Sequence, residues 1–349
     1  MKTDNRKDDW MQRALFIGGT GTISMAVTRA IANDPDWELF LINRGNREDE
    51  IPENVHLINA DIKNEEEIDE MLDGRRFDCV CDFIGYTPED AERDYRLFRG
   101  RCSQYVYISS ASAYNKPCRS YVITEGTALA NPFWEYSRNK IYCESFFMDK
   151  YEKEGFPVTI VRPSHTYDER SIPLGVHGDR GSWQVVKRML EGKPVIIHGD
   201  GTSLWTMTFN EDFAKGFVGL MGNAHAIGES FQITSDETLT WNQIYEAIAD
   251  ALDVDLIPYY VSSEFLASVS DYDYFGSLIG DKSNSVVFDN SKIKRIVPDF
   301  TCTVRFDQGV RRTIDYCLSH PECQVPDPEF DEFCDRVIDE LEEAKDRLR

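Results

Sequence analysis

Tyr136 and Lys140 suggest one kind of chemistry directly, the transfer of a proton to or from a substrate hydroxyl. They stand four residues apart, so on a helix both side chains lie on one face. A lysine ammonium beside a phenol favours the phenolate, which lowers the pKa of the tyrosine toward neutral pH. A phenolate can accept a hydroxyl proton while a hydride leaves the same carbon. Alone the pair is a weak signal, because a chain with 16 tyrosines meets this spacing by chance.

A group of serines, Ser109-Ser110-Ala111-Ser112, follows a short apolar run. In an open parallel sheet the ligand crevice lies beyond the carboxyl ends of the strands. A serine hydroxyl there can donate a hydrogen bond to a reacting oxygen and stabilise its developing charge. Serines in this position also cap turns. Three serines in four residues allow both roles, and we predict that Ser110 is catalytic and that Ser112 contacts the substrate.

A glycine-rich turn, Gly18-Gly19-Thr20-Gly21-Thr22-Ile23-Ser24, follows the first apolar run and opens a helical pattern. Glycines let the backbone approach a pyrophosphate, and a helix N-terminus supplies free N–H groups and a favourable dipole. A tight turn without a ligand is the alternative, but a position at the first strand–helix turn favours a dinucleotide. The predicted contacts in this turn are Gly18, Thr20, Gly21, Thr22 and Ile23.

The end of the second predicted strand distinguishes NAD from NADP. A carboxylate there binds the ribose 2′-hydroxyl, whereas an arginine accommodates a 2′-phosphate. The sequence Asn43-Arg44-Gly45-Asn46-Arg47 has two guanidinium groups and no carboxylate, which favours NADP over NAD. The alternative is that Arg44 stacks on the adenine or faces solvent. The predicted cofactor contacts on later strand ends and on the helix are Asn43, Arg44, Asp61, Ile62, Phe83, Gly85, Tyr136, Lys140 and Pro163.

The elements that must position these residues alternate along the first half of the chain. Apolar runs at 14–17, 39–42, 55–59, 79–84, 105–109 and 158–161 predict strands, and helical patterns occupy 22–33, 65–72 and 134–153. Such alternation implies right-handed crossovers and a parallel sheet covered on both faces. The predicted fold class is therefore α/β, a doubly wound Rossmann-like parallel sheet with a smaller C-terminal substrate lobe.

The predicted domains follow from where this alternation begins and ends. Residues 240–252 form a predicted helix with Thr240 as its N-cap. The boundaries are a polar extension over 1–11, an NAD(P)-binding domain over 12–165 with a returning strand near 229–235, a substrate lobe over 166–228 and 236–328, and an acidic helix over 329–349.

The composition of the chain limits the kinds of partner that we expect the protein to bind. The chain has 349 residues, of which 41% are hydrophobic, and a net charge of −24. This mix is typical of globular proteins, and the charge disfavours nucleic acid and anionic lipid as partners. Nine cysteines without a C-x-x-C pair favour reduced thiols over disulfides or a metal site. With no apolar leader at the start, we expect a cytoplasmic protein that acts on a small molecule and binds neither metal, nucleic acid nor membrane.

Four motifs together resemble the extended short-chain dehydrogenase/reductase superfamily, and more narrowly its NAD-dependent epimerase/dehydratase family. In chain order the motifs are residues 17–24, residues 109–114, Tyr136-x-x-x-Lys140 and Val161-Arg162-Pro163. The resemblance spans about residues 12–260. It implies that Tyr136 is the general base, that Lys140 lowers its pKa and binds ribose, and that Ser110 orients the substrate oxygen. It also implies a homodimer formed through helices near 89–99 and 134–153.

The sequence departs from the family at Trp205. Epimerases of sugar nucleotides commonly carry an arginine there that grips the diphosphate; Arg180 or Lys187 could replace it. A tryptophan suits stacking against a sugar face or a base instead. We predict Trp205 and His165 as substrate contacts, although a lone loop histidine is more often a packing residue.

These observations predict an NAD(P)-dependent epimerase of a sugar or nucleotide sugar, acting by transient oxidation of a secondary alcohol. One alternative is a dehydrogenase or reductase with an exchangeable cofactor, which would use the same residues. An alternative of another class is an RNA-binding or regulatory module, since the Gly-Gly-Thr-Gly turn also resembles that of chloroplast stem-loop RNA-binding proteins. The charge of −24 and the intact Tyr, Lys and Ser set argue against that module.

Overall fold

The computed structural model describes residues 11–45 and 51–349. One half of the molecule is built on a seven-stranded parallel sheet. The strand order is β12-β7-β5-β4-β1-β2-β3. The strands are β1 Gln12–Ile17, β2 Trp37–Asn43, β3 His56–Asn59, β4 Cys79–Asp82, β5 Tyr105–Ile108, β7 Val158–Pro163 and β12 Ser230–Ile233. The predicted α/β fold is confirmed, and the returning strand is β12.

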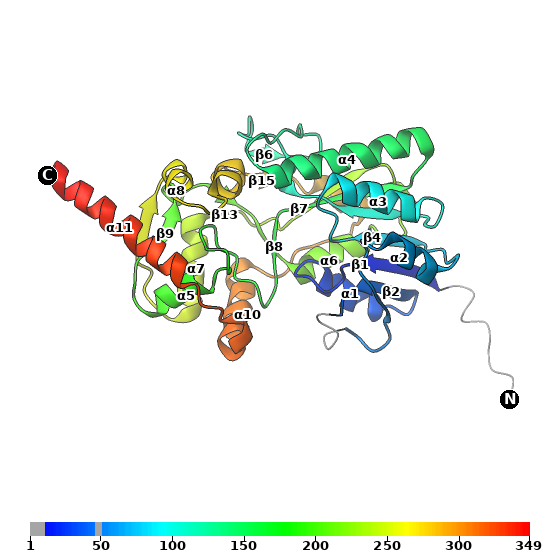
Figure 1. Cartoon of the computed structure of the whole chain (residues 1–349), viewed down its shortest axis with the longest axis horizontal. Coiled ribbons are helices and arrows are strands. Elements are labelled where there is room, and N and C mark those ends of the chain that lie inside the picture. The colour runs from blue at the N-terminus through cyan, green and yellow to red at the C-terminus, as the bar shows by residue number, and fades with distance from the viewer. Residues whose placement is uncertain (1–10, 46–50) are drawn as a thin grey trace.

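Helices cover both faces of the sheet, which is why its strands are continuous apolar runs (Figure 1). One face packs against α1 Ser24–Ala32, α6 Asn210–Val218 and α9 Ser291–Ile296. The other packs against α2 Glu65–Leu72, α3 Pro88–Phe98 and α4 Glu135–Glu154. The strand order runs in opposite directions from β1 and from β4, so a ligand crevice is expected where the carboxyl ends of these two strands separate.

A second half, the lobe, lies beyond the carboxyl ends of the strands and has its own core around Trp241, Tyr245 and Ile248 (Figure 1). Its helices are α5 Trp183–Leu190, α7 Trp241–Leu252, α8 Ser263–Val269, a π-helix Phe275–Lys282, α10 Phe306–Ser319 and α11 Pro328–Leu348. Its paired short strands are β8 His165–Tyr167 with β11 Met207–Phe209, β9 Val195–His198 with β14 Pro258–Val261, β10 Leu204–Trp205 with β13 Leu239–Thr240, and β6 Val122–Ile123 with β15 Val287–Phe288.

Two features of the lobe bear on the expected boundaries. Thr240 caps α7 with its side chain, as predicted. Helix α6 falls within 166–228 but packs against α1 on the sheet, because Phe213, Ala214 and Phe217 belong to the sheet core. That segment is therefore shared between the two halves. No described helix is long and apolar enough to cross a bilayer.

A buried ion pair joins the sheet to α4 beneath the serine motif. Arg162 on β7 donates to Glu144 on α4 at 2.6 Å, and the two side chains are 6% and 3% exposed. Glu144 also accepts a hydrogen bond from the hydroxyl of Ser109, and Arg162 donates to the hydroxyl of Tyr114 at 3.3 Å. The pair therefore fixes the position of α4 relative to the ends of β5 and β7.

Replacing Glu144 by alanine is expected to lower the free energy of unfolding by about 3–5 kcal/mol, because it leaves the Arg162 guanidinium buried without its partner. The measurement is urea denaturation. Glu191→Ala is the matched control: its carboxylate pairs with Lys187 at 44% exposure of both side chains, and its loss should change stability by no more than about 1 kcal/mol. Equal losses in the two variants would contradict the assignment.

Candidate active site

The structure brings Tyr136, Lys140 and Ser110 together at the carboxyl ends of β4 and β5. Tyr136 lies in the first turn of α4, and its phenol is within hydrogen-bonding reach of the Ser110 hydroxyl. Lys140, about 1% exposed, follows one turn later. Its Nζ donates to the carbonyl oxygens of Gly85 at 2.6 Å and Ile108 at 2.7 Å. These carbonyls follow β4 and end β5, so Lys140 anchors the helix at the crevice.

The electrostatics of the pair differ from the sequence expectation. Burial raises the pKa of Tyr136, and the hydrogen bond with Ser110 opposes that rise. The expected lowering by Lys140 is not found, because its ammonium faces two carbonyls and lies 5.7 Å from the centroid of the Tyr136 ring. Burial lowers the pKa of Lys140 to about 8. In this geometry the phenol therefore keeps its proton at neutral pH.

Ser112 lies behind Ser110 in a buried hydroxyl network. Its Oγ is 2.9 Å from the Ser110 Oγ and accepts a hydrogen bond from Ser137 at 2.8 Å. Its carbonyl accepts one from Asn131 Nδ2 at 2.7 Å. At 3% exposure, Ser112 is placed to orient Ser110 and not to face a ligand. Ser110 is thus the more accessible serine, and the predicted substrate contact of Ser112 stays a prediction that this burial disfavours.

The glycine-rich turn leaves room for a pyrophosphate. A Cβ on Gly21 would meet only the Ser24 Oγ, at 3.5 Å, whereas a Cβ on Gly18 would lie 2.4 Å from Ile84. Gly18 also has φ +78°, which favours glycine. Ile23 at the N-cap offers no side-chain cap, which leaves the start of α1 open to an anion. The Met25 N–H already donates to the Gly21 carbonyl at 2.9 Å. The turn therefore fits a dinucleotide.

Ser24 replaces the third glycine without opening the turn. Its Oγ accepts a hydrogen bond from the Gly21 N–H and donates one to the Gly18 carbonyl, both at 2.8 Å. These two hydrogen bonds hold the turn together. The space toward which a Cβ on Gly21 would point stays open.

The other predicted cofactor contacts lie on the same edge. Asn43 at the end of β2 donates to the Thr20 hydroxyl at 3.0 Å, and Arg44 next to it is exposed. Arg47 lies outside the described residues. After β3, Asp61 is exposed and Ile62 is buried. The remaining predicted contacts, at the ends of β1, β4 and β7, are Gly18, Phe83, Gly85 and Pro163.

Asp82, which the sequence reasoning missed, is fully buried at the end of β4. One carboxylate oxygen accepts from the Ile84 N–H at 2.9 Å, and the other has no hydrogen-bond partner among the described residues. Burial raises its pKa, and the charge of Lys140 opposes that rise. An aspartate that closes an apolar run was the available signal.

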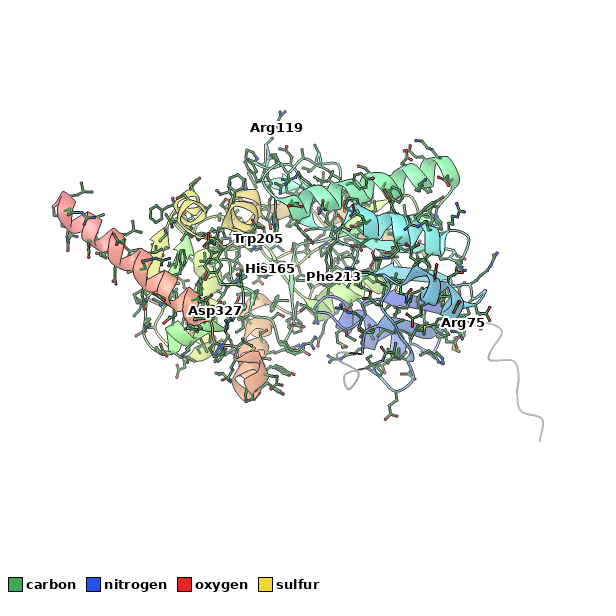
Figure 2. All side chains as sticks on the ribbon, viewed as in Figure 1. Arg75, Arg119, His165, Trp205, Phe213 and Asp327 are labelled. Atoms are coloured by element: carbon green, nitrogen blue, oxygen red, sulfur yellow. The ribbon has the colours of Figure 1, made fainter. Side chains whose placement is uncertain are left out.

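On the lobe side, His165 and Trp205 lie in the middle of the molecule, between the two halves (Figure 2). Burial lowers the pKa of His165 to about 3. Trp205 is 5% exposed, and its indole N–H is buried without a partner in the described structure. Neither replacement for the missing arginine is confirmed as a cleft residue: Lys187 pairs with Glu191, and Arg180 donates to Pro326.

A family model for the NAD dependent epimerase/dehydratase family matches residues 14–234. The chain belongs to this family. Among its relatives is the 2'-dehydrokanamycin reductase of Streptomyces kanamyceticus, 24% identical over 82% of this chain and 80% of that protein. Another is the chloroplast stem-loop binding protein of 41 kDa b of Arabidopsis thaliana, 24% identical over 69% of this chain and 63% of that protein.

A solved structure of UDP-glucuronic acid 4-epimerase from Bacillus cereus, in complex with UDP-glucuronic acid and NAD, matches with a TM-score of 0.70 at 19% identity. The match covers 88% of this chain and 99% of that one. The resemblance and the fold found in the sequence are thus confirmed, and this member of the NAD-dependent epimerase/dehydratase family is an enzyme. The predicted homodimer and cytoplasmic location stay predictions.

Gly21→Val should weaken binding of the dinucleotide, NADH or NADPH, with at least about a tenfold rise in Kd, because the branched side chain fills the open space of the turn. The unfolding temperature should hardly change, since no protein atom other than the Ser24 hydroxyl lies near the new Cβ. Fluorescence titration with NADH and with NADPH, together with thermal unfolding, tests this.

Gly126→Val is the control, because a Cβ there would likewise meet a single hydroxyl, that of Thr124, at 3.7 Å. Unchanged affinity of Gly21→Val for both NADH and NADPH would show that this turn does not bind the dinucleotide.

Proposed function

We propose that this enzyme epimerises a sugar or nucleotide sugar by transient oxidation of a secondary alcohol. The observation that supports this best is the convergence of Tyr136, Ser110 and Lys140 at one edge of the sheet. A nicotinamide dinucleotide, when bound, would accept and return the hydride. The residues of the glycine-rich turn and of the β2 end would hold it.

The side chains of this site divide the work with the substrate. Ser110, oriented by Ser112, donates a hydrogen bond to the reacting oxygen. Tyr136 in its phenolate form takes up the hydroxyl proton in the oxidation, and the phenol so formed returns it in the reduction. Lys140 uses two of its three N–H donors on carbonyls, which leaves one donor for a ribose hydroxyl.

A reductase with an exchangeable cofactor is the second candidate, and two observations favour it. Burial keeps the Tyr136 phenol protonated, and a protonated phenol is the form that donates to a carbonyl oxygen. The relative from Streptomyces kanamyceticus, of which this chain matches 80%, is named as a reductase.

We also propose that the enzyme prefers NADP, because Arg44 stands exposed at the end of β2 where a 2′-phosphate would lie. Acid-quenching freshly purified protein and separating the released dinucleotide tests the cofactor and the reaction type together. An epimerase should release a stoichiometric dinucleotide, since it retains its cofactor through the cycle. We expect NADP(H).

Other outcomes of this measurement are equally informative. Stoichiometric NAD(H) would contradict the role given to Arg44. An empty protein that binds the dinucleotide on titration would favour the reductase. Failure to bind either form would overturn both candidates and favour a binding module.

Tyr136→Phe should lower turnover by about 10²–10⁴-fold, because the proton-transfer group is lost while the ring remains. Turnover is followed with a sugar that the wild type converts, and dinucleotide binding should stay within about twofold. Tyr142→Phe is the matched control on the same helix, since Tyr142 is 46% exposed and lies away from the crevice. Full activity of Tyr136→Phe would rule out the proposed mechanism.

A further inference from the structure

Lys282 is the last residue of the π-helix Phe275–Lys282. Contacts to its backbone carbonyl hold this residue in place. Its carbonyl oxygen accepts hydrogen bonds from Trp241 Nε1 at 3.1 Å and Ser203 Oγ at 3.2 Å. His198 Nε2 lies 3.4 Å from the same oxygen. Groups from α7, β9 and the loop between β9 and β10 thus fix where this lysine stands.

The ammonium of Lys282 is buried and almost unpaired. The residue is 9% exposed, and among the described residues its Nζ makes only one long hydrogen bond, 3.5 Å to the Ser277 carbonyl. It forms no ion pair within that part of the chain and lies 5.8 Å from the ring centroid of Trp134. Burial lowers the pKa of Lys282, and the charges of Asp281 and Asp273 oppose that fall. An anion bound at the Nζ would stabilise the ammonium further.

The carboxylates near Lys282 are shared with other groups. Asp281 pairs with Lys116 at 3.5 Å and also acts on Lys282 through its charge, so one buried carboxylate serves two lysines. Asp273 is exposed and accepts a hydrogen bond from the Trp134 indole at 2.7 Å. The nearby histidines are neutral at pH 7, because burial and the charge of Lys282 lower the pKa of His165, His177 and His198.

Three further polar groups of the lobe lack hydrogen-bond partners. The Trp205 indole N–H and the hydroxyls of Thr166 and Thr206 are buried without a hydrogen bond in the described structure. Thr166 belongs to β8, Trp205 belongs to β10, and Thr206 follows β10. Trp205 lies near His165 in the central region of Figure 2. Their placement suits a ligand rich in hydrogen-bond acceptors.

Lys282 belongs to the region of the reacting residues. The Trp134 and Tyr136 rings lie 5.0 Å apart, and Asp281 is close enough to affect the pKa of Tyr136. Asn131 donates both to the carbonyl of Gly280, at 2.6 Å, and to that of Ser112. The end of the π-helix is thereby tied to the serine network.

We propose that Lys282 binds an anionic oxygen group of the substrate, a carboxylate or a phosphoryl group attached to the sugar. This deepens the proposed function and rests on it, because it assumes that the reacting carbon of the same molecule lies at Tyr136. A lysine acts as a point charge, so either anion satisfies it.

The test measures binding rather than turnover. Full-length protein saturated with dinucleotide is titrated calorimetrically with D-glucuronate, D-glucose 6-phosphate, D-glucose and inorganic phosphate. At least one of the two anionic sugars should bind about tenfold or more tightly than glucose, as a charge-assisted hydrogen bond would give. Lys282→Met should remove that difference and leave glucose binding unchanged, whereas Lys282→Arg should retain most of it.

Lys187→Met, which removes an exposed lysine, is the matched control and should keep the preference. The Lys282→Met variant should also unfold at a higher temperature, because a buried, unpaired charge is lost. A lower unfolding temperature in both Lys282→Met and Lys282→Gln would assign the ammonium a structural role and overturn the proposal.

Three binding results would also overturn it: equal affinity for charged and neutral sugars, a preference that survives Lys282→Met, or phosphate binding as tight as that of glucose 6-phosphate, which indicates an adventitious ion only. Repeating the titration with Tyr136→Phe tests the two proposals separately. If the wild-type protein converts no sugar, but it and Tyr136→Phe both prefer anionic sugars through Lys282, the anion site stands and the catalytic proposal fails.

Discussion

The site depends on one buried charge, the ammonium of Lys140. Its bonds to the carbonyls of Gly85 and Ile108 join α4 to the ends of two neighbouring strands. The rings of Tyr86 and Tyr107 lie with their centroids 4.8 and 4.9 Å from the ammonium and add cation–π stabilisation. Because a helix is rigid, fixing Lys140 also fixes Tyr136 one turn earlier, and Ser110 at the end of β5 comes within its reach.

The crevice keeps several buried polar groups that the protein alone does not satisfy. Asp82 has a carboxylate oxygen without a described partner, and Lys282 has an ammonium with one long hydrogen bond. Glu144 and Arg162, by contrast, satisfy one another. Unsatisfied groups lower stability, and they persist where binding or catalysis uses them. The Lys282 ammonium and the Trp205 indole N–H are therefore candidates for contact with a ligand.

The sequence predicted the sheet well because each strand of the first half is a local apolar run bounded by turn residues. It also identified Ser110 correctly as a residue that follows β5, since the end of that run was visible. It did not reveal the burial of Ser112, because Asn131 and Ser137 enclose it from a different segment.

Lys116 and Lys282 were missed for a related reason. Each is a single charged residue in a segment without a periodic pattern, and only tertiary packing brings the two together around Asp281. Helix α6, Asn210–Val218, was not predicted either.

The protonation state of Tyr136 distinguishes the two candidate reactions physically. An epimerase uses the phenol in both directions, so a raised pKa hinders the oxidation, which needs the phenolate, and assists the reduction, which needs the phenol. A reductase carries out only the reduction, so the raised pKa of Tyr136 does not slow it. Raising the pH increases the phenolate fraction, so oxidation should accelerate with pH while reduction slows. The burial of Tyr136 therefore slows the oxidation step relative to the reduction step at neutral pH.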